Sequence, residues 1–164
     1  MKKLIGLVLL AALAGCSNSD DAKMISACES VIRKMAVDPA GISVNSSSVI
    51  TAAPEERNLR RFAELKSRNG QLSVDQEAAL QVDIRRRAKL QESYVSVDYT
   101  DHQSLGASRD KAVCWYMNTG RGFELASVSA FGRSISGFPL FAFFVEHGAP
   151  EHLSSSLSDF SPRR

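Results

Sequence analysis

The chain has 164 residues, of which 44% are hydrophobic and 23% are charged. This composition is typical of one globular domain and excludes a chain that is disordered throughout. Lys2 and Lys3 account for the whole formal net charge of +2, so the remainder of the chain has no net field that would attract nucleic acid.

The start of the chain has the three parts of an export signal. Lys2 and Lys3 form a cationic start, residues 4–13 are an apolar run, and small residues follow. A helix needs roughly 20 apolar residues to cross a bilayer. We therefore interpret residues 1–15 as a cleaved signal peptide and not as a permanent membrane helix.

The residues Leu13, Ala14, Gly15 and Cys16 resemble the lipobox of bacterial lipoproteins. The resemblance implies that the Cys16 thiol is lipidated, that the signal is cut before it, and that residues 16–21 form a lipidated tether. Ser17 stands where lipoproteins of the inner membrane often carry Asp, which implies an outer-membrane anchor facing the periplasm. The alternative is an ordinary signal peptide with a chance cysteine.

Two further cysteines, Cys28 and Cys114, remain if Cys16 is lipidated. In an oxidising compartment, a disulfide between them is the default expectation. A reactive or metal-binding pair is the alternative, but neither a CxxC spacing nor a nearby histidine supports it.

The spacing of apolar residues predicts an amphipathic helix over residues 20–37. Its apolar face contains Cys28 and four other residues, and Pro39 and Gly41 end the helix. Residues 42–50 follow as a weak strand, interrupted by serines. The other residues on the apolar face are Met24, Val31, Ile32 and Met35.

Residues 51–92 are predicted to form an inserted helical hairpin, with Ser73 and Gln76 in the spacing of a capping box. Its basic residues could form an electrostatic surface that binds phosphate-bearing lipid A or an acidic partner. The alternative is a solvated helix face with i, i+4 ion pairs. We favour the solvated face. The basic residues are Arg57, Arg60, Arg61, Lys66, Arg68, Arg85, Arg86, Arg87 and Lys89.

After residue 92 the hydrophobic pattern alternates, which predicts strands around residues 95–100, 112–117 and 122–131. If Cys28 bonds Cys114, the face with Ala112, Cys114 and Tyr116 must look toward the first helix. The apolar run of residues 138–145 is interpreted as a buried strand or, alternatively, as an exposed docking segment.

The expected fold class is α+β: an N-terminal helix packed on a small antiparallel sheet of three or four strands, with an inserted helical hairpin. Residues 22–147 would form this single domain, and residues 148–164 a flexible polar tail. The run VSVDYTDHQSLGASRDKAVCWY, after a cysteine-bearing helix and a DP break, resembles small exported bacterial domains of no assigned activity with a helix-to-strand disulfide. This resemblance implies a fold and no chemistry.

A catalytic site is not expected. No serine stands in a GxSxG motif, and the spacing of His147 and His152 does not suit a metal site. The sequence indicates neither a metal nor another cofactor. Asp98, Asp101 and His102 are interpreted as a hairpin connection.

The candidate binding surface consists of Tyr99, Trp115, Asp101 and His102. Aromatic side chains on a strand can stack on a ligand, although more often they belong to a core. The sheet face that carries Trp115 is therefore either covered by the inserted hairpin or free to bind.

These patterns favour an outer-membrane lipoprotein with a noncatalytic periplasmic domain that binds an envelope protein. Such a module predicts an exposed apolar patch at Trp115 or at residues 138–144. One alternative is an inhibitor or protective protein that acts on a lytic enzyme or an incoming agent through a loop at residues 101–109. A periplasmic hydrolase at Asp98, Asp101 and His102 is the weaker alternative. A nucleic-acid partner is not expected, and the sequence leaves the oligomeric state open.

Overall fold

A computed structural model describes residues 19–67, 69–103 and 106–151. Its centre is a five-stranded antiparallel sheet in which every strand pairs with its neighbours in the chain. The fold is α+β, as predicted, but the prediction of three or four strands was wrong. The strands are β1 (Ile42–Ala52), β2 (Gln91–Gln103), β3 (Gly106–Asn118), β4 (Phe123–Ala130) and β5 (Arg133–Ser136).

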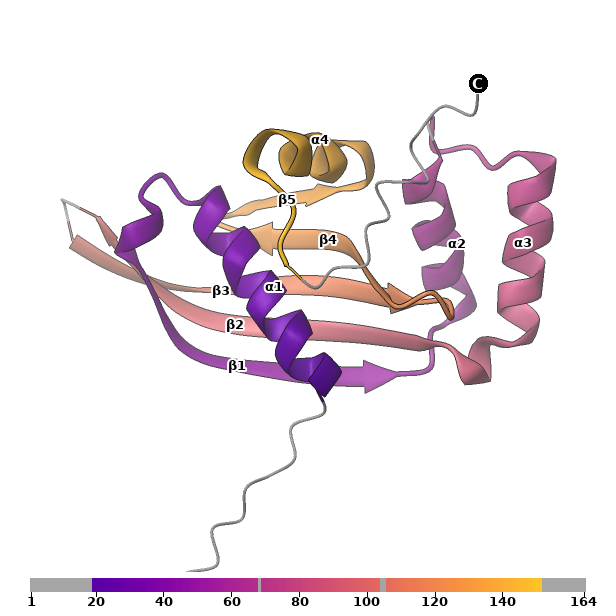
Figure 1. Cartoon of the computed structure of the whole chain (residues 1–164), viewed down its shortest axis with the longest axis horizontal. Coiled ribbons are helices and arrows are strands. Elements are labelled where there is room, and N and C mark those ends of the chain that lie inside the picture. The colour runs from indigo at the N-terminus through magenta and orange to yellow at the C-terminus, as the bar shows by residue number, and fades with distance from the viewer. Residues whose placement is uncertain (1–18, 68, 104–105, 152–164) are drawn as a thin grey trace, which may run out of the picture.

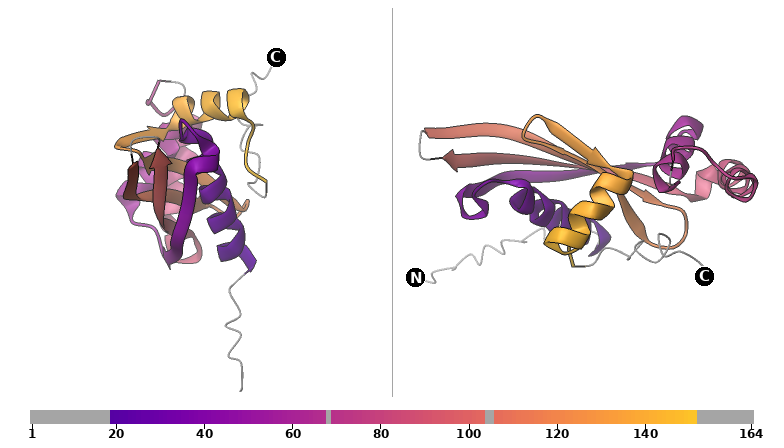
Figure 2. Two further views of the ribbon diagram at one scale, coloured as in Figure 1. Left: turned by 90° about the vertical axis from the view of Figure 1, so that its left-hand side faces the viewer. Right: turned by 90° about the horizontal axis from the view of Figure 1, so that it is seen from above.

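Four helices surround the sheet. In Figure 1, α1 crosses the front of the sheet, α4 lies along its upper side, and α2 and α3 form a hairpin at its right end. Helix α1 spans Ser19–Met35, α2 Glu56–Lys66, α3 Val74–Arg85 and α4 Gly137–His147, and two short 3-10 turns are η1 (Pro39–Gly41) and η2 (Arg87–Lys89). Figure 2 shows the hairpin projecting from the end of the sheet.

Helix α1 forms because its apolar residues recur on one face, and this face packs on the sheet. Asp20 and Asp21 lie in its first turn and Arg33 and Lys34 in its last turn, where each sign of charge complements the helix dipole. Because α1 begins at Ser19, the last residues of the predicted tether are helical. The predicted apolar face is confirmed: Met24, Cys28, Val31, Ile32 and Met35 are all buried.

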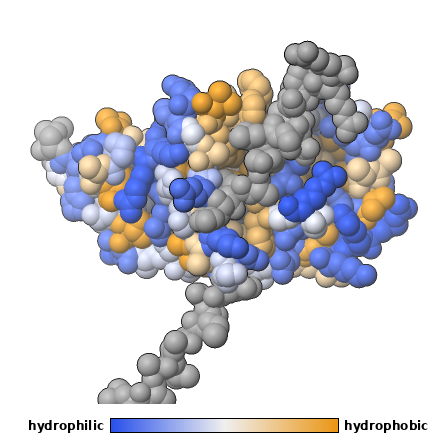
Figure 3. Space-filling view, viewed as in Figure 1, coloured by the Kyte–Doolittle hydropathy of each residue, from blue (hydrophilic) through white to orange (hydrophobic). Residues whose placement is uncertain are grey.

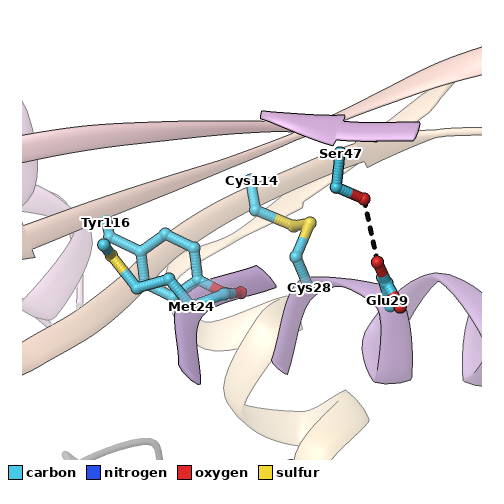
Figure 4. The surroundings of a disulfide bond; sticks show 6 residues. All are labelled: Met24, Cys28, Glu29, Ser47, Cys114 and Tyr116. Carbon is cyan, nitrogen blue, oxygen red and sulfur yellow. Dashed lines mark hydrogen bonds between the residues drawn. A yellow bond between two sulfur atoms is a disulfide. The ribbon is translucent and has the colours of Figure 1, made fainter. Parts of the chain in front are cut away.

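The disulfide between Cys28 and Cys114 is present, with an S–S distance of 2.01 Å and a Cα–Cα distance of 5.9 Å. It joins α1 to the central strand β3, as Figure 4 shows. Next to it, the Tyr116 hydroxyl donates to the Met24 carbonyl at 2.9 Å. On β1, the Ser47 hydroxyl donates to the Glu29 carboxylate at 2.8 Å. The face of β3 with Cys114 therefore looks toward α1, as the sequence predicted.

The predicted helical insertion is confirmed as the hairpin of α2 and α3. Ser73 caps α3 by accepting from the Gln76 amide, and the Gln76 side chain accepts from the Ser73 amide. The hairpin covers part of the other sheet face and makes a second, smaller core there. This core contains Leu59, Phe62, Leu80, Leu90, Trp115, Met117 and Ala126.

Two corrections concern the chain after β4. A two-residue turn at Phe131 and Gly132, both with positive φ, reverses the chain into the fifth strand, which the sequence analysis did not anticipate. The apolar run predicted as a buried strand is helix α4. Pro139 suits the first turn of that helix, because the amides of a first turn have no partner within the helix.

Candidate functional site

The predicted binding surface does not form, because two of its four residues belong to the core. Tyr99 is fully buried on the sheet face toward α1. Its hydroxyl donates to Asp110 and accepts from the Phe131 amide, both at 3.2 Å. Burial raises the pKa of this phenol. Tyr99 is therefore unavailable to a partner in this structure.

Trp115 lies beneath the hairpin and is only 5% exposed. The Phe62 ring meets it edge-on with 6.4 Å between centroids, and Tyr94 stacks beside it at 6.5 Å. The Arg61 guanidinium lies 5.4 Å from the ring centroid. The hairpin thus covers this part of the sheet face, and no described residue forms a hydrogen bond with the buried indole N–H.

The residues at the predicted polar loop are mostly in strands. β2 continues to Gln103 and β3 starts at Gly106, so the loop over residues 101–109 that the inhibitor alternative predicts is wrong, because most of these residues are in strands. Asp101 is buried and accepts from the Gln103 side chain at 2.7 Å, whereas His102 is exposed. The structure therefore brings Asp101 and His102 to a strand end, apart from Trp115.

Asp98 has partners that do not suit a catalytic base. It accepts two hydrogen bonds of 2.8 Å from Arg109 and one of 2.8 Å from Asn45. The Arg109 and Asn45 bonds lower the pKa of Asp98 to about 2. A carboxylate held in its charged form in this way serves as an ion-pair partner, and no hydrogen bond joins it to His102 within the described residues.

Helix α4 presents the largest apolar side chains that the structure leaves uncovered. Only Leu140 is buried, while Phe138 is 63% exposed and Val145 68% exposed. We define the apolar α4 surface as Phe138, Phe141, Phe144 and Val145. In Figure 3, apolar residues gather over α4 at the upper side of the molecule. Phe141 and Phe144 are half-buried, and Phe144 packs in part against the main core. Exposed apolar residues beside such half-buried rings can mark an interaction site.

A pocket of about 430 Å³, including solvent at its mouth, lies beside the apolar α4 surface, between α4, α2 and β4. The Lys66 ammonium and the Glu124 carboxylate form an ion pair of 2.7 Å in its wall. The other lining residues are apolar or small: Phe62, Leu65, Leu125, Ala126, Gly137, Leu140, Phe141 and Phe144.

Gly137 allows α4 to approach α2 closely. A Cβ atom at this position would lie 2.9 Å from the Leu65 carbonyl oxygen, and the φ of 55° is one that favours glycine. The close approach sets the width of the pocket. The sequence predicted a docking segment at residues 138–145 only as the alternative to a buried strand. The pocket beside this run has no sequence signal except Gly137, which precedes it.

Other kinds of site have no support in the described part of the chain. Residues 19–67, 69–103 and 106–151 contain no group of three or more side chains that could hold a metal ion. None of the helices formed by these residues has the length and apolar character needed to cross a bilayer. Cys16 and His152 lie outside the described residues.

The chain has no match among protein-family models, curated proteins or solved structures. Its function must therefore be argued from its own residues, and the apolar α4 surface with its pocket is the site that they favour.

Proposed function

We propose that this chain is a lipoprotein of the outer membrane, anchored through Cys16, whose noncatalytic domain binds an envelope protein through the apolar α4 surface and the adjacent pocket. The observation that carries the proposal is the exposure of Phe138 and Val145 on a helix with a single buried residue. Burying apolar surface against a partner contributes roughly 25 cal/mol per Å², so an uncovered aromatic helix favours association.

The position of α4 favours a protein over the bilayer as its partner. Cys16 precedes the first residue of α1, Ser19, by three positions, a reach of about 10 Å. The anchor would therefore lie close to the N-terminal end of α1. Helix α1 has 17 residues and is about 25 Å long. Helix α4 lies on the opposite side of the molecule from the N-terminal end of α1 (Figures 1 and 2), and therefore away from the membrane that would hold the anchor.

The pocket indicates how a partner would bind. The depression beside Leu65 and Phe144 is lined mostly by apolar groups, so the partner group that suits it is an apolar side chain. Side chains that fill such pockets are typical of the residues that dominate protein interfaces. The partner we propose is thus an envelope protein that presents an apolar anchor residue to α4.

Photo-crosslinking in cells tests this proposal. A photoreactive amino acid replaces Phe138, and a matched variant carries it at Ile50, an apolar residue on β1 that is 71% exposed. We expect one protein adduct of constant mass from position 138 and none from position 50. The same adducts from both positions would show that exposure alone explains them and would contradict the proposal.

The inhibitor alternative has one observation in its favour. β4 pairs with β3 only from Val113 onward, so the ends of β2 and β3 near His102 and Arg109 extend beyond β4. A third photoreactive variant at His102 separates the two functions. An adduct with a lytic enzyme from position 102, without an adduct from position 138, would favour the inhibitor.

A further inference from the structure

The end of the helical hairpin carries three exposed cations without partners. Arg85 ends α3, and Arg87 and Lys89 belong to η2. Within the described residues, none of these three side chains forms a hydrogen bond or an ion pair. We call Arg85, Arg87 and Lys89 the basic corner.

The other described cations of the hairpin differ, because they are occupied. Arg57 pairs with Glu55 at 2.7 Å, Arg60 with Glu77 at 3.0 Å, Lys66 with Glu124 at 2.7 Å and Arg86 with Asp83 at 2.7 Å. Arg61 lies over the Trp115 ring. None of these ion pairs has the predicted i, i+4 spacing, since Arg60 pairs across the hairpin with α3 and Lys66 pairs with β4. The basic corner differs from these cations because its side chains have no partner among the described residues.

The backbone that carries the basic corner is held in place. Leu90 directly after η2 is buried in the second core. The Arg86 guanidinium donates to Asp83 and also to the Thr119 carbonyl in the turn after β3, at 2.8 Å. A cation at the C-terminal end of a helix stabilises it through the dipole, which accounts for Arg85. Arg87 and Lys89 lie beyond α3, so the dipole does not explain them.

The basic corner lies on the same side of the molecule as the N-terminal end of α1. In Figure 1, α3 descends to η2 at the lower right, and α1 begins at the lower centre. The left view of Figure 2 also has the start of α1 at the bottom, away from α4. A lipid on Cys16, three positions before Ser19, would place this side against the bilayer.

We propose that Arg85, Arg87 and Lys89 bind the phosphate groups of anionic phospholipids in the membrane that holds the anchor. This inference rests on the lipid anchor of the proposed function and adds an orientation of the domain on the membrane. The acyl chains and the basic corner would be two attachments to the bilayer, and together they keep α4 on the side of the domain that faces away from it. Lysine and arginine near an anionic surface are attracted within about one Debye length.

Acidic residues on the same side limit the strength of this binding. Asp20 pairs with Lys23, Glu55 with Arg57 and Asp83 with Arg86. Asp21 and Glu56 complete the acidic residues of the first turns of α1 and α2. Binding through the basic corner alone is therefore weak and falls steeply with salt, as expected for an attachment that assists an anchor.

Vesicle binding of the unlipidated chain tests the basic corner without the anchor. Residues 17–164 contain the disulfide and every described contact, so this form keeps the complete described fold. It is mixed at low salt with vesicles of phosphatidylcholine, with and without phosphatidylglycerol, and binding is measured by cosedimentation. We expect binding only to the phosphatidylglycerol vesicles, and its loss at high salt.

The variant R87Q/K89Q is compared with R109Q/K111Q, which removes the same charge from β3 at the other end of the sheet. Each cation should contribute about fivefold to the affinity for phosphatidylglycerol vesicles, so R87Q/K89Q should bind them roughly 25-fold more weakly. The affinity of the control R109Q/K111Q should fall by less than about threefold. Equal losses, or no dependence on phosphatidylglycerol, would overturn the inference. Trp115 emission checks that each variant is folded. Membrane release of Cys16→Ser tests the anchor separately, so the two proposals can fail independently.

Discussion

The side-chain amide of Asn58 on α2 donates to both carboxylate oxygens of Glu92 on β2, at 2.9 and 3.0 Å. Glu92 is buried and also accepts from the Tyr94 hydroxyl at 2.6 Å. The substitution Asn58→Ala leaves this carboxylate under-satisfied, so we expect the free energy of unfolding to fall by about 1 to 3 kcal/mol. Urea denaturation followed by Trp115 emission measures the change.

The control for Asn58→Ala is Gln81→Ala, because Gln81 is exposed on α3 and, among the described residues, its side chain bonds only to Glu77. A surface substitution of this kind should change the free energy of unfolding by no more than about 0.5 kcal/mol. Equal effects of the two substitutions would mean that the bonds to Glu92 do not hold the hairpin on the sheet.

Leu140 and Phe138 on α4 should differ in their effects on stability. Leu140 is buried, so Leu140→Ala should lower the free energy of unfolding by about 2 to 5 kcal/mol. Phe138 is mostly exposed, so Phe138→Ser should change it by no more than about 0.5 kcal/mol while abolishing the proposed binding. Thermal or urea denaturation checks both. A large loss from Phe138→Ser would place this ring in the core and would argue against the apolar α4 surface as a docking site.

The disulfide should contribute strongly to stability, because Cys28 and Cys114 are 86 positions apart. The chain-entropy relation predicts about 4.5 kcal/mol for a loop of this length. We expect the double substitution Cys28→Ala and Cys114→Ala to shift the urea midpoint downward by a corresponding amount. Reductant should lower the urea midpoint of the unchanged chain to that of the double variant. It should not shift the urea midpoint of the double variant itself.

The three tyrosines, Tyr94, Tyr99 and Tyr116, all have raised pKa values. Burial is the main cause in each, and for Tyr94, where the Glu92 carboxylate contributes, the pKa reaches about 12. The unfolded chain loses these protons near pH ~10. The folded state therefore binds more protons above that pH, and the free energy of unfolding falls as the pH rises from there toward the folded pKa values.

An alkaline titration of phenolate absorbance checks this expectation. The folded protein should show little phenolate at the pH where the urea-unfolded protein is half ionised. In the variant Tyr94→Phe, the contribution of Tyr94 to the pH dependence of the free energy of unfolding should disappear. A folded protein that titrates like the unfolded one would contradict the burial of Tyr99 and Tyr116, which are both 0% exposed.

The sequence predicted the elements whose pattern repeats with a clear period. The face of α1 followed from apolar residues at helical spacing, and β2 and β3 followed from strict alternation around Val95 and Cys114. The capping spacing of Ser73 and Gln76 predicted the start of α3. The disulfide then ordered these parts, because it required the Cys114 face to look toward α1.

The candidate site was harder to predict, since alternation defines two faces of a strand without saying what covers each of them. Tyr99 and Trp115 lie on opposite faces, and α1 covers one while the hairpin covers the other. The run of residues 138–145 has no period because nearly every residue is apolar. Its helical form depends on the turn at Gly137 and its contact with α2, which are tertiary features.

The bond between Cys28 and Cys114 also determines how the domain would bear mechanical tension. Nine residues of α1, Ser19 to Ala27, precede the disulfide, and only these could be stripped from the sheet by a pull on the N-terminal end of the helix. Further load passes covalently into β3, which is hydrogen-bonded to β2 on one side and β4 on the other. A domain held at its N-terminus and pulled at α4 would thus carry the strain through its central strand and spare the edge strand β1.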